Sequence, residues 1–239
     1  MRPLLAQARV ELVLTLRRGE SVLLTLVIPV LLLVFFSLVD VLPIDGEPVD
    51  FLTPGVIALA VLSTAMVNVA IATGFERQYL VLKRLGATPL GRPRLLAAKT
   101  LAVVAVEALQ VVVLAAVGLA LGWDPSVEPV LLVGAVLLGT VGFSGLGLLM
   151  AGSLRAEVTL ALANGLYLVL LLLGGMVVPL EELPGWLRRL AEWLPAAALA
   201  DAVTGALAEG ASVPGRAWLV LAVWAVGAPV AAALTFRWE

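Results

Sequence analysis

Residues 75–99 read FERQYLVLKRLGATPLGRPRLLAAK and separate two long apolar stretches of the chain. The first half of this run predicts a short amphipathic helix that ends at Gly86. Its charged face is expected to carry Glu76, Arg77, Lys83 and Arg84, and its apolar face Tyr79, Val81, Leu82 and Leu85. Two interpretations stay open at this point: a basic loop anchored on anionic lipid, or a helix that docks a soluble subunit.

The composition is that of a membrane protein. Hydrophobic residues make up 62% of the chain and charged residues 13%, with a mean hydropathy of +1.11, which lies outside the range of soluble proteins. No stretch is polar and long enough for a separate soluble domain, so residues 1–239 predict a single membrane domain. Cysteine and histidine are absent, which removes disulfides and the usual ligands of zinc, haem and iron–sulfur clusters.

The apolar runs predict helices that cross the bilayer. A run of about 20 apolar residues spans the hydrocarbon core as a helix. These runs are continuously apolar and lack the alternation of barrel strands. We therefore expect an all-α membrane protein with six transmembrane helices. Their predicted ranges are 22–39, 51–75, 100–121, 130–152, 158–179 and 217–236.

The basic residues predict the orientation, because Lys and Arg are enriched in cytoplasmic loops. Three of the fifteen, Arg188, Arg189 and Arg216, fall on one side of the predicted spans and the other twelve on the opposite side. Both termini are therefore expected in the cytoplasm. The excess of Arg over Lys, with abundant Ala, Leu, Val and Gly, suggests a bacterial cell membrane.

Shorter helices are expected at the two membrane surfaces. Residues 3–19 predict a helix on the cytoplasmic surface that ends at Gly19. Residues 181–207 predict two outer helices, an amphipathic one between Pro184 and Pro195 and a partly inserted one after it.

One acidic residue, Glu107, falls deep inside a predicted span, with Gln110 one turn further on. It could face a substrate path and attract a cationic or polar compound, or carry a proton. Alternatively, it is protonated or hydrogen-bonded and ties helices together near Asn68 or Asn164. The sequence leaves these alternatives open.

Three sets of motifs resemble ABC-2 type transporter permeases. The cytoplasmic set is ER at 76–77, LKRL at 82–85, ATPL at 87–90 and LLAAK at 95–99. The others are TPG at 53–55, which opens the second span, and GG at 174–175 followed by LPGW at 183–186 and LP at 194–195. The similarity covers essentially the whole chain and is nearest to drug and antibiotic exporters of the daunorubicin type.

This resemblance implies a permease subunit of an ATP-driven exporter for a hydrophobic or amphipathic drug, antibiotic or lipid. Residues 76–94 would be its coupling-helix loop and 3–19 its connecting helix. The implied partners are two copies of a cytoplasmic ATPase subunit and a second permease, identical or different, meeting near 165–175. Membrane lipid is also an expected partner, whereas nucleic acid is not.

The sequence contains no G-x-x-x-x-G-K-[ST] motif, so ATP and Mg²⁺ are expected on the partner subunit, with no cofactor or metal bound by this chain. The chain itself is therefore expected not to be an enzyme. A second interpretation is an ATP-independent carrier or channel with Glu107 as a relay, although the two halves show no convincing repeat.

Overall fold

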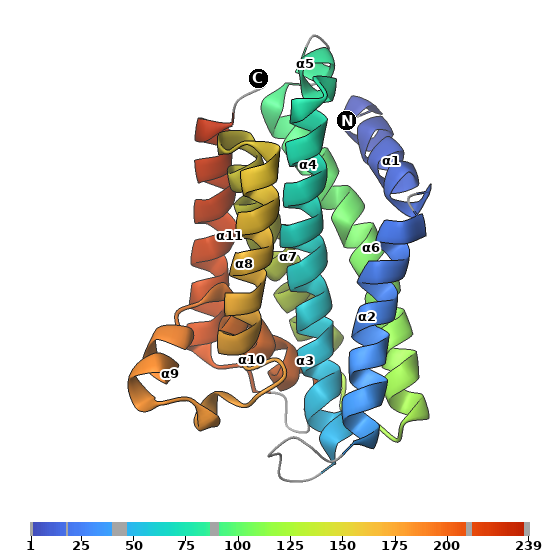
Figure 1. Cartoon of the computed structure of the whole chain (residues 1–239). Helices are drawn as coiled ribbons and strands as arrows, with labels where there is room; N and C mark the ends of the chain where they lie inside the picture. The colour runs from blue at the N-terminus through green and yellow to red at the C-terminus, as the bar shows by residue number, and fades with distance from the viewer. Residues whose placement is uncertain (1, 18, 40–46, 87–90, 209–211, 237–239) are drawn as a thin grey trace.

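The computed structural model describes residues 2–17, 19–39, 47–86, 91–208 and 212–236, and within these ranges every regular element is helical (Figure 1). In chain order the elements are α1 (Arg2–Arg17), α2 (Gly19–Leu38), α3 (Pro48–Leu62), the π-helix η1 (Ser63–Asn68), α4 (Val69–Gln78), α5 (Val81–Gly86), α6 (Arg92–Ala120), α7 (Pro129–Ser153), α8 (Ala156–Leu173), the 3₁₀ turn η2 (Leu180–Glu182), α9 (Gly185–Ala191), α10 (Pro195–Leu207) and α11 (Gly215–Thr235).

The long helices run side by side between two ends of the molecule (Figure 1). The start of α1, the end of α11 and helix α5 lie together at one end, which we name the α5 end. Helices α9 and α10 lie at the opposite end, which we name the α9 end. The segments that the basic residues assign to opposite membrane surfaces therefore lie at opposite ends of the bundle.

Five helices in the described part of the chain are long and apolar enough to cross a membrane. They are Pro48–Gln78, Ala97–Ala120, Pro129–Ser153, Ala156–Leu173 and Gly215–Thr235. These confirm an all-α, multi-pass membrane protein. The predicted first span, 22–39, coincides with α2, but its described apolar part, Thr25–Leu38, is shorter than a full span. Five of the six predicted spans are thus supported, and the first, 22–39, stays a prediction.

The second span lies at the centre of the bundle (Figure 1). Helices α3, η1 and α4 form one continuous rod over Pro48–Gln78, and every side chain from Leu52 to Leu62 is buried. These residues are apolar or small on all sides, so the rod can be covered by other helices on every face. The π-helical turn η1 widens this rod at Ser63–Asn68, a type of insertion that often marks functional sites.

Several predicted boundaries differ from the observed ones. The long helix continues to Gln78 rather than ending at 75, and α6 begins at Arg92 rather than at 100. Helix α8 ends at Leu173 rather than 179, because Gly175 takes a left-handed backbone with φ of 65°. The outer segment contains η2, α9 and α10, with α9 starting after Pro184 and α10 at Pro195. Residues 40–46 and 87–90, the latter within the predicted coupling loop, lie outside the described residues.

Glycines let α7 approach two neighbouring helices closely. A side-chain carbon added at Gly145 would lie 2.5 Å from the backbone nitrogen of Pro229 in α11. One added at Gly147 would lie 2.6 Å from the carbonyl oxygen of Met66 in η1. Either distance is too short for a real contact, so both positions need a residue without a side chain. These glycines therefore serve packing within one chain.

Helix α8 is the least covered of the five candidate spans. Large apolar side chains on it are exposed, among them Leu168 and Leu172, and a side-chain carbon added at Gly165 would meet nothing within 4 Å. An exposed apolar face of this kind is covered in a membrane by lipid or by another protein.

Candidate functional site

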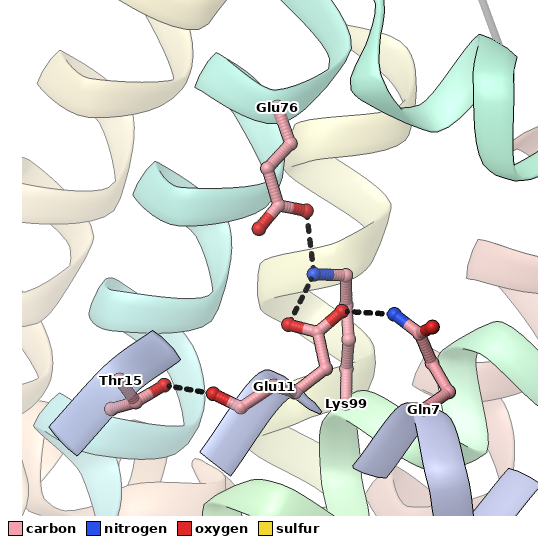
Figure 2. Close-up of polar contacts among 5 residues, drawn as sticks. All are labelled: Gln7, Glu11, Thr15, Glu76 and Lys99. Atoms are coloured by element: carbon pink, nitrogen blue, oxygen red, sulfur yellow. Dashed lines mark hydrogen bonds and ion pairs between the residues drawn. The ribbon is translucent and has the colours of Figure 1, made fainter. Parts of the chain in front are cut away.

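A buried ion-pair cluster joins three helices at the α5 end (Figure 2). The ammonium group of Lys99 in α6 lies 2.6 Å from a carboxylate oxygen of Glu76 in α4 and 3.0 Å from one of Glu11 in α1. The other Glu11 oxygen accepts a hydrogen bond of 2.9 Å from Gln7. The side chain of Lys99 is only 5% exposed, and removing one partner of such a buried pair leaves an uncompensated charge. The cluster therefore ties α1, α4 and α6 together.

The chain breaks its helix between α4 and α5. Leu80 has a φ of 60°, a left-handed conformation that is rare for a residue with a large side chain. Its amide donates to the carbonyl oxygen of Arg77, and its own carbonyl accepts from the amide of Arg84. The helix axis is therefore interrupted where the sequence pattern predicted one continuous amphipathic helix.

This break separates the four residues predicted to share one charged face. Lys83 and Arg84 lie on α5 and are exposed, next to the exposed side chains of Tyr79 and Val81, while Leu82 is buried beneath them. Glu76 lies on α4, in the ion-pair cluster. The prediction of one shared helical face is wrong because the left-handed residue rotates α5 relative to α4.

Arg77, the fourth residue, also binds within the chain. Its guanidinium donates a hydrogen bond of 2.8 Å to the carbonyl oxygen of Ala151, near the end of α7. The neighbouring Gln78 donates one of 2.8 Å to Glu157 at the start of α8. Cationic groups near a helix C-terminus satisfy carbonyls that lack helical partners. These bonds tie the end of α4 to α7 and α8.

Glu107 forms no hydrogen bond with Asn68 or Asn164 in the described part of the chain. Its side chain is 1% exposed and one of its oxygens is bound by the hydroxyl of Thr140 in α7. That hydroxyl also lies 2.7 Å from the carbonyl oxygen of Val136. Because a hydroxyl has one proton, a protonated Glu107 that donates to Thr140 satisfies both contacts. Glu107 thus ties α6 to α7. This agrees with the alternative that Glu107 links helices, but its partner is Thr140 rather than Asn68 or Asn164.

Gln110 forms a second buried connection. Its side-chain oxygen accepts a hydrogen bond of 3.1 Å from Thr64 in η1, and its amide donates one of 2.9 Å to the carbonyl oxygen of Thr25 in α2. Neither Thr64 nor Thr25 was predicted as a partner. The polar side chains of α6 therefore fasten it to α2, η1 and α7.

Asn68 and Asn164 instead line a groove between α2, η1 and α8. The groove has a volume of about 320 Å³ and is lined mostly by apolar residues. Its polar groups also include Tyr167 and Ser63, and none of the described side chains that line it is charged. The four predicted polar residues thus fall into two groups, since Glu107 and Gln110 are not part of this lining.

A charged cluster that the sequence analysis missed lies at the α9 end. Arg216, at the start of α11, pairs with Glu192 and lies 3.6 Å from Asp201 in α10, while Arg188 lies 3.4 Å from both Glu192 and Glu181. Burial raises the pKa of Asp201, and the Arg216 guanidinium acts in the opposite direction. Arg188 and Glu192 are four residues apart on one helix turn, whereas Arg216 lies 24 residues from Glu192 in the sequence, so no local spacing points to the pairs made by Arg216.

Comparison with known protein families gives a match over most of the chain. The family model described as ABC-2 type transporter matches residues 4–208. This range includes the ion-pair cluster, α5 and the groove. A search of curated proteins finds no match.

Proposed function

Because the chain belongs to the ABC-2 type transporter family, whose permeases partner with ABC ATPase subunits, we propose that it is the membrane subunit of an ATP-driven exporter. Two ATPase subunits would bind a dimer of permeases at the α5 end, which would face the cytoplasm of a bacterial cell. The cargo would be a hydrophobic or amphipathic compound.

The observation that carries this proposal is the construction of the α5 end. Helix α5 presents exposed apolar and basic side chains, Val81, Lys83 and Arg84, and sits directly on the end of the central rod. A surface that combines cationic and apolar groups suits a soluble protein partner better than the membrane interior. Contact with an ATPase would cover this surface.

Bonds around the end of α4 would carry a displacement of α5 into the bundle. The Lys99 cluster links α4 to α1 and α6, Arg77 links it to α7, and Gln78 links it to α8. A push on α5 would therefore move several spans together. The switching free energy would come from contacts that differ between the nucleotide-bound and nucleotide-free states.

The groove between α2, η1 and α8 is the proposed cargo path. Apolar walls with carboxamide and hydroxyl groups suit an uncharged molecule that has both apolar and hydrogen-bonding parts. Helix α8 borders the groove and has an exposed apolar face, so a second permease packed on α8 would help to enclose it.

Charge reversal at α5 tests the proposal. In membranes that contain the chain with its ATPase subunit, Lys83→Glu with Arg84→Glu should abolish transport-coupled ATP hydrolysis while the permease still inserts. The single variant Arg84→Glu has a matched control in Arg189→Glu, an arginine that is also exposed, on α9 at the opposite end. Wild-type coupling in the α5 variants, or cargo movement by the permease without any ATPase, would refute the proposed function.

A further inference from the structure

A small cavity lies beside the ion-pair cluster at the α5 end. It has a volume of about 40 Å³ and is bounded by α1, the rod from η1 to α4, and α6. Its charged lining residues are Glu11, Glu76 and Lys99. A cavity of this size exceeds the roughly 10–15 Å³ that one water-sized particle requires.

The charges around this cavity do not balance. Two carboxylates face one ammonium group, and among the described residues no other charged side chain belongs to the lining. Both carboxylates are largely withdrawn from solvent, with exposed fractions of 12% for Glu11 and 14% for Glu76. A net charge of −1 in such a place is costly unless a further positive charge compensates it.

Unpaired oxygen atoms at the same cavity provide an independent observation. The hydroxyl of Thr73 is buried, with the residue 1% exposed, and has no hydrogen-bond partner among the described residues. Thr73 lines the cavity, together with Asn68. Only one of the two Glu76 oxygens is used by Lys99. A hydroxyl, a carboxamide and a carboxylate oxygen are thus available around one small space.

We propose that this cavity binds one small monovalent cation, with oxygen ligands from Thr73, Asn68 and Glu76. One bound cation would neutralise the net charge of −1 on the lining. A water molecule would satisfy the hydrogen-bonding groups but would leave that negative charge uncompensated. A divalent ion is less suited, because protein sites for such ions are built from a larger carboxylate charge than two carboxylates beside an ammonium supply. A cation in this cavity is repelled by one ammonium group and attracted by two carboxylates, so the sum of the lining charges favours it.

The bound cation would strengthen the junction of α1, α4 and α6. All three helices contribute a charged side chain to the cavity, so the cation would stabilise the arrangement in which they meet. This property belongs to the permease chain alone and does not depend on the ATPase or on cargo.

Sodium binding to the purified full-length chain tests the proposal. In nanodiscs of uncharged lipid, radioactive sodium at equilibrium should bind with one ion per chain, and sodium chloride should raise the thermal unfolding temperature above that in choline chloride of equal ionic strength. Choline is too large for a cavity of about 40 Å³.

Thr73→Val removes the hydroxyl with little change in volume and should weaken sodium binding at least about tenfold. The control is Thr53→Val, a buried threonine whose hydroxyl bonds to Val49 of its own helix, away from the cavity, and which should bind sodium as the wild type does. If the Thr73 variant fails to fold, Asn68→Ala provides the same comparison. Absence of sodium binding to the wild type, which would mean a cavity filled by water only, or equal binding by the cavity variant, would overturn the proposal.

Discussion

Replacing Lys99 by methionine should destabilise the chain strongly. Methionine keeps most of the side-chain length but removes the ammonium that lies 2.6 Å from Glu76 and 3.0 Å from Glu11. Removing one partner of a buried ion pair costs about 3–5 kcal/mol. Since both carboxylates are largely withdrawn from solvent, with exposed fractions of 12% and 14%, we expect a loss within this range, at least about 3 kcal/mol. This corresponds to roughly a hundredfold change in the unfolding equilibrium constant.

The measurement is reversible unfolding in mixed micelles by added SDS, followed by the fluorescence of the six tryptophans. A triple variant, Lys99→Met with Glu11→Gln and Glu76→Gln, is the matched control because it removes all three charges together. It should recover most of the lost stability, since a neutral replacement leaves no buried charge unpaired. If Lys99→Met unfolds within about 0.5 kcal/mol of the wild type, the cluster does not hold the three helices together.

Three further predictions concern other parts of the structure. Glu107→Gln should change the unfolding free energy in SDS by less than about 1 kcal/mol, because a carboxamide can donate to Thr140 as a protonated carboxyl does. Glu107→Ala should cost about 2 kcal/mol. Equal losses in the two variants would contradict the assignment of a proton to Glu107. Gly145→Ala should cost about 1–3 kcal/mol through its contact with Pro229, while Gly227→Ala, in open space on α11, should not destabilise, as SDS unfolding can check. Burial raises the pKa of Asp201, so the folded state binds its proton more tightly and loses stability as pH rises above about 3.8; Asp201→Asn should lack this loss, and parallel pH profiles of the two proteins would refute it.

Much of the bundle could be predicted because a helix that spans lipid can be recognised from a long run of apolar residues. Continuous apolar runs predicted five of the observed long helices. At the α9 end, α9 begins directly after Pro184 and α10 begins at Pro195, the two prolines used as boundaries in the sequence. The helix break at Leu80 was not predicted, because leucine is not a residue type that favours a left-handed turn and nothing in the local sequence indicates one. The amphipathic pattern therefore predicted one helix through Leu80, where the backbone in fact ends α4 and starts α5 in a different orientation.

The polar partners could not be predicted for a different reason. Glu107 meets Thr140 across 33 residues, and Arg77 meets Ala151 across 74. Such pairs depend on how each helix is rotated about its own axis. In a helix that is apolar on all sides, the sequence does not specify that rotation. The sequence identified Glu107 and Gln110 because charged and amide groups are rare in apolar surroundings, and Glu76 as part of a charged helical face, but it did not identify their contacts.

Cross-linking from α5 tests the central claim most directly, because the native chain has no cysteine and a single introduced one is unambiguous. Arg84→Cys, on the exposed surface of α5, should form a cross-link to the ATPase subunit in the assembled complex, and the yield should change with nucleotide. Val130→Cys, exposed at the opposite end of α7, should form none. A cross-link from position 130 and none from position 84 would contradict the account.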